Sequence, residues 1–287
     1  MNAPGMLTYV YAVTQPTDRL HEALAGLRGI GQEPARLLPP TTATPSTGPI
    51  PLAFVAGDVP ARDFNETSLK DHFEDLHWLE YVARTHHDVV QAVAAHAPVL
   101  PLRMATVYQD DQRACQALAD QHDSFAQRLD QLHAHTEYGV KIYLSPTTTG
   151  PNPATDADAP STQQASTTPG KAYLQARRAQ HHAREAVHRQ ARQAADAIEA
   201  IAARHTTHRV RHAPQRGALT GPQENILNDA YLIPDDQADQ FQSAIAEAAR
   251  SFPDLRIEVT GPWAPYSFAM PPPASPAGPD DAPEPPP

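Results

Sequence analysis

Fifteen histidines are the side chains in this sequence that could most readily ligate a metal ion. They gather at His86-His87, at His133 and His135, at His181-His182, and at His205, His208 and His212. Adjacent histidines on a helix point about 100° apart and chelate poorly. The His-Glu-x-x-His pattern of zinc hydrolases is absent. We therefore predict no metal site and interpret the histidines as surface or helix-capping residues.

The residues that could serve in catalysis form no recognisable catalytic set in this sequence. The carboxylate pairs Asp110-Asp111 and Asp235-Asp236 stand at predicted helix starts, where the helix dipole favours negative charge. Cys115, the single cysteine, lies beside an apolar stripe with no local base, which indicates a buried or half-buried thiol rather than a nucleophile. The sequence contains no phosphate-binding loop, dinucleotide fingerprint or Gly-x-Ser-x-Gly elbow. We predict no enzyme activity and no cofactor.

The most unusual segment is residues 259–268, Val-Thr-Gly-Pro-Trp-Ala-Pro-Tyr-Ser-Phe. Its two prolines fix the backbone, and Trp263, Tyr266 and Phe268 follow a predicted strand end. One interpretation is an aromatic clasp over the edge of a domain. The other is a docking surface of rigid aromatic side chains, which makes these three residues candidates for protein binding.

A basic stretch supplies the second group of candidates. Residues 171–216 carry ten Lys/Arg and three Asp/Glu, a net charge of +7, although the whole chain has a net charge of −11. Such a stretch is typical of a solvated helix face, but Arg184, Arg189 and Arg192 could also bind an acidic partner. Because no helix-turn-helix, zinc or aromatic stacking pattern accompanies it, we predict no nucleic-acid binding.

The elements that must position these residues are those of a two-domain α+β protein. Apolar periodicity predicts a mixed α+β domain over residues 1–134. Its predicted strands are 6–13, 52–59 and 99–108. Its predicted helices are 18–27, a segment from 65 to before Pro98 that is one helix with a break or two helices in succession, and 110–133.

The second predicted domain spans residues 135–268. Its strands are expected at 136–144, 209–212, 226–233 and 255–260, with a long helix at 171–205 and another beginning at Pro234. This β-α-β-β-α-β order is that of a ferredoxin-like fold. The long helix would span about 50 Å, so one end could project. Residues 145–169 and the Pro-rich tail 269–287 lack the apolar residues that ordering requires, so we predict disorder there.

Compartment signals point to the cytoplasm. The N-terminus lacks a basic region followed by an apolar one, and no stretch of the chain approaches the 18 apolar residues that would span a membrane. One cysteine cannot form a disulfide within the chain, which favours a reducing compartment. We predict a cytoplasmic protein without membrane association. The sequence leaves its oligomeric state open.

Taken in order, seven segments resemble the gas vesicle protein GvpL/GvpF family. That family closes its last strand with Thr-Gly-Pro-Trp-Pro-Pro-Tyr-Ser-Phe, and this chain has the same run at residues 260–268 with Ala264 replacing a proline. A family strand that ends Phe-Gly-Thr-Val-Phe corresponds to residues 99–108, where Met104 and Ala105 replace Phe-Gly. The other matching segments are residues 9–12, 78–90, 137–143, 170–174 and 228–233.

The resemblance covers about residues 6–268 and implies an accessory protein of gas vesicle formation. Gas vesicles are hollow protein shells in the prokaryotic cytoplasm, and their main shell protein is small, apolar and aggregation-prone. The resemblance implies that the chain binds the shell protein, other accessory gas vesicle proteins, or both, during assembly. It also implies a C-terminal ferredoxin-like domain and no enzyme activity. The alternative is a ferredoxin-like regulatory or small-ligand-binding module without a gas vesicle role.

Overall fold

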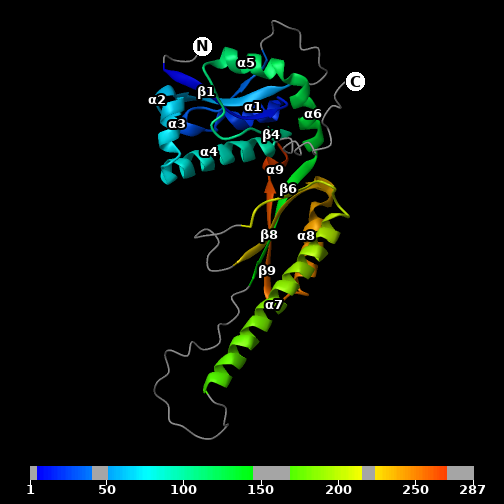
Figure 1. The fold of residues 1–287 in the computed structure, drawn as a ribbon. Helices are drawn as coiled ribbons and strands as arrows, with labels where there is room; N and C mark the ends of the chain where they lie inside the picture. Colours follow the sequence, from blue (N-terminus) through cyan, green and yellow to red (C-terminus); the bar gives the residue numbers. More distant parts are fainter. Residues whose placement is uncertain (1–4, 41–50, 145–168, 215–223, 270–287) are drawn as a thin grey trace, which may run out of the picture. The chain divides into compact units, whose positions relative to one another are not determined.

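A computed structural model describes residues 5–40, 51–144, 169–214 and 224–269 (Figure 1). It is a mixed α+β structure with two antiparallel sheets. The chain divides into two compact units. Unit 1 comprises Met1–Thr136 and Trp263–Pro287, and unit 2 comprises Glu137–Pro262. The sequence-based boundary placed residues 263–268 in the second domain, whereas here they belong to unit 1.

Unit 1 is built on a five-stranded sheet in the order β2-β3-β1-β4, with β5 also paired to β1. Its strands are β1 (Met6–Thr14), β2 (Arg36–Leu38), β3 (Ala53–Pro60), β4 (Val99–Pro101) and β5 (Val107–Tyr108). The long pairing of β1 with β3 runs from Met6 opposite Pro60 to Thr14 opposite Ala53 and shifts register at Tyr11. A bulge of this kind re-aims a side chain, and Tyr11 here accepts a hydrogen bond from Ile30 N–H at 2.9 Å.

Helices cover both faces of this sheet. The helical elements are α1 (Asp18–Ala25), η1 (Ile30–Gln32), α2 (Ala61–Phe64), α3 (Glu66–His72), α4 (Leu76–Ala94), α5 (Asp111–Asp120), α6 (His122–Leu132) and α9 (Tyr266–Ala269). One layer packs Leu20 of α1 and Val82, Val89 and Val93 of α4 on the sheet. On the other face, Phe54 of β3 meets Phe125 of α6 with ring centroids 5.9 Å apart. Burial from both sides explains why β1 is buried from Thr8 to Thr14.

Two elements of unit 1 that were predicted as continuous, the strand 99–108 and the helix 110–133, are divided in the structure. The predicted strand 99–108 is interrupted after Pro101, where Ala105 takes a φ of +63° and the chain bends before β5. From residue 65 the structure has two helices in succession, α3 and α4, which is one of the two predicted arrangements, and Asp75 caps α4 by accepting from His77 and Trp78 N–H. The predicted helix 110–133 divides into α5 and α6 at Gln121.

Unit 2 has the strand order β7-β8-β6-β9. Its elements are β6 (His135–Leu144), α7 (Pro169–Ala202), β7 (Arg209–Arg211), β8 (Asn225–Pro234), η3 (Asp235–Gln237), α8 (Ala238–Ala249) and β9 (Leu255–Trp263). Alternate residues of β6 and β8 form one apolar face, which packs against Ile198 of α7 and against Phe241 and Ile245 of α8. The last strand was predicted to end at 260 but continues through the Gly-Pro-Trp sequence.

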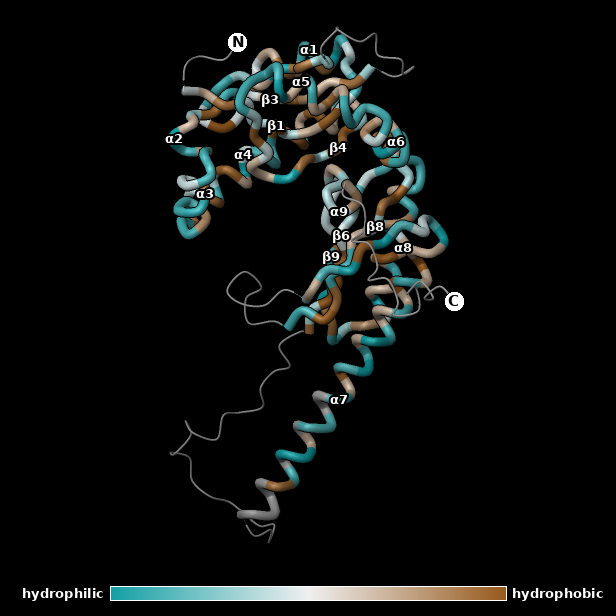
Figure 2. Tube along the Cα trace, turned by 45° about the horizontal axis from the view of Figure 1, so that its top comes forward, coloured by the Kyte–Doolittle hydropathy of each residue, from teal (hydrophilic) through white to brown (hydrophobic). Residues whose placement is uncertain are grey.

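The two halves of α7 have different environments. Ala191, Ala194, Ile198 and Ile201 are buried in the core of unit 2, whereas the side chains described before His188 are exposed or half-buried. Figure 1 shows the N-terminal half extending beyond the strands of this unit, and Figure 2 shows α7 as largely hydrophilic with short hydrophobic bands. The expectation that one end of this helix projects from the unit 2 core is therefore confirmed.

The remaining expectations concern disorder and the membrane. The segments predicted as disordered, 145–169 and 269–287, lie outside the described residues except for Pro169 and Ala269, which belong to α7 and α9. None of the helices in the described part of the chain is long and apolar enough to span a membrane.

Candidate functional site

The Pro-aromatic segment packs on unit 1. Ala264 is 2% exposed, and its backbone N–H donates to the side-chain oxygen of Gln91 on α4. At the other end of the segment, the Arg128 guanidinium of α6 donates to the Phe268 carbonyl at 3.5 Å. The substitution of alanine for proline at 264 thus leaves an N–H that this contact uses. A proline there would have no such donor.

The three aromatic side chains of the segment differ in exposure. The Trp263 ring centroid lies 5.4 Å from that of His87, and Trp263 is 39% exposed. Tyr266 stacks on His87 at 5.9 Å and is half-buried, as is Phe268. The segment therefore acts as a clasp within unit 1, and Trp263 is the aromatic side chain that it presents most openly to solvent. A protein-binding role for these residues stays a prediction.

His86 lies in the core of unit 1. It is one turn of α4 away from the predicted apolar positions Val82, Val89 and Val90. It is 4% exposed, so its interpretation as a surface or capping residue is wrong. Its Nδ1 lies 2.9 Å from the hydroxyl of Tyr9, and that hydroxyl accepts a hydrogen bond from Ala105 N–H at 3.0 Å. Because a residue at 86 falls on the same helical stripe as 82, 89, 90 and 93, the spacing itself was the signal for burial.

Burial sets the ionisation of this pair. It lowers the pKa of His86 to about 4, an effect that the nearby His87 increases and the Leu102 backbone partly offsets. Burial also raises the pKa of Tyr9. Both side chains are therefore neutral near pH 7. The Leu102 backbone is thus a second hydrogen-bond partner of the His86 ring, beside the Tyr9 hydroxyl.

A cavity of about 380 Å³ adjoins this histidine in unit 1. Its walls come from α4, from the turn after β4, and from α9. The lining residues are Ala83, His86, His87, Pro101, Leu102, Arg103, Met104, Tyr266 and Ala269. The size and the mainly apolar lining, with few polar groups, are those of a site for an apolar ligand or side chain. Sequence reasoning missed it because residues from three distant segments form it.

The candidate arginines lie on α7 of unit 2. Arg189 and Arg192 are exposed, while the side chain of Arg184 is outside the described part of the structure. The two described arginines thus have the exposure that binding an acidic partner needs. They belong to unit 2, whereas Trp263 and Tyr266 belong to unit 1.

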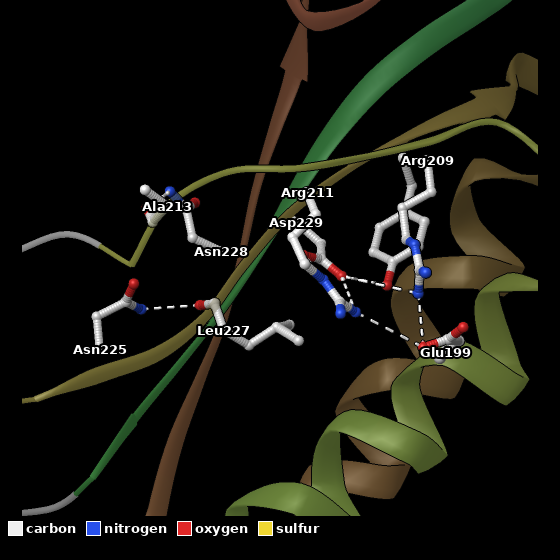
Figure 3. Close-up of polar contacts among 9 residues, drawn as sticks. Glu199, Arg209, Arg211, Ala213, Asn225, Leu227, Asn228 and Asp229 are labelled. Carbon is white, nitrogen blue, oxygen red and sulfur yellow. Dashed lines mark hydrogen bonds and ion pairs between the residues drawn. The ribbon is translucent and has the colours of Figure 1, made fainter. Parts of the chain in front are cut away.

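Unit 2 has its own buried charge, Asp229 of β8 (Figure 3). Its carboxylate is 1% exposed and accepts from Arg211 Nε at 3.2 Å and from the Tyr231 hydroxyl at 3.4 Å. Arg209 bridges to Glu199 of α7 at 2.6 Å. Burial, together with the charge of Asp229, raises the pKa of Tyr231 to about 12. This cluster joins β7, β8 and α7, and its paired charges fit a structural role.

One group of metal-ligating side chains is close enough to be considered among the described residues. The ligand atoms of His181, His182 and Glu185 on α7 lie within 4.8 Å of one another, and all three residues are exposed. Each histidine Nδ1 is within 3.5 Å of the Glu185 carboxylate. These short contacts also suit ordinary surface pairing along a helix.

The chain is similar in sequence to known gas vesicle proteins. A family model described as "Gas vesicle synthesis protein GvpL/GvpF" matches residues 7–270. Gas vesicle protein L of Streptomyces sp. (strain CB03234) is 37% identical over 264 residues, which cover 92% of each chain. Gas vesicle protein F of the same strain is 28% identical over 279 residues, covering 92% of this chain and 99% of that protein.

Two solved structures are similar in fold. The crystal structure of GvpF from Microcystis aeruginosa has a TM-score of 0.56 at 16% identity and covers 92% of this chain and 99% of that one. The crystal structure of GvpF from Anabaena sp. PCC7120 has a TM-score of 0.57 at 16% identity, with coverages of 92% and 96%.

Proposed function

This chain belongs to the gas vesicle synthesis protein GvpL/GvpF family, and we propose that it is a non-catalytic accessory protein that binds the main shell protein of gas vesicles during assembly. The observation that carries the proposal is the match along nearly the whole chain. Other accessory gas vesicle proteins are further partners in this proposal. Family membership favours this role over a ligand-binding module unrelated to gas vesicles.

The surface of unit 1 supports a partner of apolar character. Phe73, Leu76, Tyr81 and Trp263 are large apolar side chains that are at least 39% exposed. A shell subunit with apolar surface needs a partner that covers it until it joins the wall, and exposed apolar side chains are the groups that can do so. We place this encounter in the cytoplasm, where the vesicle is built.

Co-purification tests the proposal. The chain, tagged at its N-terminus, is expressed with the shell protein and captured, and we expect the shell protein in the eluate. Deleting the gene is expected to abolish or malform the vesicles, seen by electron microscopy, and re-expression should restore them. If the captured chain brings down neither the shell protein nor another gas vesicle protein, and the deletion strain still makes normal vesicles, the proposal fails.

The exposed arginines of α7 are proposed to bind an acidic surface of a partner. Exchanging Arg184, Arg189 and Arg192 for glutamate should weaken partner binding at least tenfold at low salt, and the loss should shrink at high salt. A control with Arg62, Arg84 and Arg113 of unit 1 exchanged for glutamate changes the net charge equally. Equal affinities for the two triple variants would contradict the proposed role of α7.

Unit 2 is proposed to be a ferredoxin-like domain. Its element order is β6-α7-β7-β8-α8-β9, and its sheet order of β7-β8-β6-β9 places each strand that follows a helix on an edge. This arrangement supports a domain that folds without unit 1. Expression of residues 137–262 alone, with two-dimensional NMR of the product, tests the proposal, and a spectrum of an unfolded chain would contradict it.

A further inference from the structure

The turn between α3 and α4 exposes two large apolar side chains. Phe73 is 47% exposed and Leu76 is 78% exposed. Trp78 holds this turn in place. Its ring stacks on His72 at a centroid distance of 4.6 Å, contacts Phe73 at 6.5 Å, and contacts Phe64 of the core at 5.4 Å. The turn is therefore a fixed apolar surface, which is the kind of surface that binds a partner.

The same turn is acidic. Residues 71–83 contain four carboxylates and no lysine or arginine. Asp71, Glu74 and Asp75 are exposed beside the two apolar side chains. An apolar surface with acidic neighbours selects for a segment that offers an apolar side chain close to cations. We call residues 71–76 the acidic turn.

The projecting half of α7 offers that combination. Residues 171–192 contain six Lys/Arg and one glutamate, a net charge of +5. Leu174 is 54% exposed, and Arg177 and Arg178, one helical turn away on the same side, are exposed as well. Figure 1 shows this half of α7 extending beyond the strands of unit 2. The helix therefore complements the acidic turn both in charge and in apolar character.

We propose that the acidic turn of one molecule binds the projecting half of α7 of a second copy of this chain. Leu174 packs against Phe73 and Leu76, and Arg177 and Arg178 face the carboxylates around them. The two surfaces of the contact are different, so the association is head-to-tail and joins molecules into chains or rings. A turn against one helix is smaller than a permanent interface, so the association is weak and reversible.

Self-association of this kind is separate from the accessory role but uses one of its surfaces. The acidic turn contains two of the exposed apolar side chains that the proposed function gives to the shell protein. A second copy and the shell protein therefore compete for it, and self-association covers this surface when shell protein is scarce. Because no other gas vesicle protein takes part, the association is measured on the purified chain, and its failure leaves the accessory role untouched.

Sedimentation equilibrium of the purified full chain tests the association. At low ionic strength the weight-average mass should rise with protein concentration beyond the mass of one molecule. The dissociation constant should increase at least tenfold between about 20 mM and about 500 mM salt, because the charges at the contact are then screened. A mass that stays that of one molecule at every concentration in low salt would overturn the proposal.

Charge reversal on each side identifies the two surfaces. Asp71→Lys with Glu74→Lys makes the turn basic, and Arg177→Glu with Arg178→Glu makes the helix acidic. Each double variant should self-associate at least tenfold more weakly than the wild type. An equimolar mixture should restore the association, because each basic surface then meets an acidic one on the other variant. Restoration also shows that both variants are folded. Wild-type association in either variant alone, or no association in the mixture, would overturn the pairing.

Two control variants carry the same charge changes elsewhere. Asp120→Lys with Asp130→Lys alters exposed carboxylates of unit 1, and Arg204→Glu with Arg250→Glu alters exposed arginines of unit 2. Both should associate within twofold of the wild type. A loss as large as that in the reversed surfaces would mean that net charge alone sets the association, which overturns the proposal. If the wild type does not self-associate and reversal of the turn abolishes shell-protein binding, the turn belongs to the shell protein instead.

Discussion

Unit 1 buries His86 as a neutral ring beside a cavity, whereas unit 2 buries the Asp229 carboxylate and surrounds it with donors. Both residues sit on elements that pack against the sheet or within it. The carboxylate meets two partners from its own hairpin and is satisfied within the fold. The histidine meets the Tyr9 hydroxyl and the Leu102 backbone, and burial keeps its ring neutral. A buried ionisable group that stays neutral makes stability depend on pH near neutrality, whereas a carboxylate held by donors does so only in acid.

The strongest way to sharpen this contrast is to titrate His86. Its pKa of about 4 in the folded state lies below the ordinary value of 6.5, so the unfolded chain binds more protons between these pH values. Its contribution to the stability of unit 1 is complete above about pH 6.5 and is lost as pH falls toward 4, and the loss is about 3 kcal/mol.

Tryptophan fluorescence can follow this loss selectively. The only tryptophans of the chain, Trp78 and Trp263, both belong to unit 1, so urea unfolding monitored by fluorescence reports that unit. A His86→Gln variant removes the titrating ring and should have a correspondingly flatter dependence of stability on pH. Parallel curves for the wild type and the variant would contradict the role given to His86.

The corresponding change in unit 2 is Asp229→Ala. It leaves the Tyr231 hydroxyl and the Arg211 guanidinium without their shared acceptor, and we expect a loss of about 2 kcal/mol. Hydrogen exchange of the β8 amides measures this loss, since unit 2 contains no tryptophan. As a control, Arg250→Ala breaks the pair with Glu247, whose side chains are 75% and 70% exposed, and should cost less than about 0.5 kcal/mol. Equal losses in the two variants would mean that the buried carboxylate contributes no more than a surface pair.

A third change acts on the backbone that supports Tyr9. Ala105 has a φ of +63°, a left-handed conformation that costs a non-glycine residue about 1–2 kcal/mol, and its N–H donates to the Tyr9 hydroxyl. Ala105→Gly should therefore stabilise unit 1 by about 1 kcal/mol in the same fluorescence assay. Ala95→Gly, at the right-handed end of α4, should not stabilise it. A loss of stability in Ala105→Gly would show that the conformation is not strained.

Ala105 also marks what the sequence could and could not predict. The sequence showed that Ala105 replaces a glycine that is typical of the family. It could not show that Ala105 has a positive φ, because this conformation depends on the bend between β4 and β5 that lets both strands pair with β1. Apolar periodicity predicted most elements of the β-α-β-β-α-β order of unit 2 because β6, α7, β8 and α8 each bury apolar residues at regular spacing. The predicted length of the helix, about 50 Å, indicated that one end of α7 projects.

The candidate site was harder to predict than the elements. Periodicity places His86 on the buried stripe of α4, but only the tertiary structure shows that the Tyr9 hydroxyl and the Leu102 backbone are its partners. The cavity needs residues from α4, the turn after β4 and α9, which are separated by up to 186 positions between Ala83 and Ala269. The return of the chain to unit 1 after β9 has no local signal beyond the Gly-Pro-Trp sequence itself.

The smallest expected effect concerns Glu199, which joins α7 to β7 at the rim of the Asp229 cluster. Its contacts with Arg209 at 2.6 Å and Arg211 at 3.7 Å are solvent-accessible, with 52% of the glutamate side chain exposed. The hydrogen bond from Arg209 lowers the pKa of Glu199, so this contribution is present above its ordinary pKa and lost on acidification. Glu199→Gln should therefore cost on the order of 0.5 kcal/mol near pH 7 and nothing measurable in 1 M salt, where surface pairs are screened. Hydrogen exchange of β7 and β8 at low and high salt measures the difference. If Glu199→Gln lost as much stability as Asp229→Ala, the exposed edge of the cluster would stabilise unit 2 as much as its buried centre does. The contrast between the buried centre and the exposed edge would then be wrong.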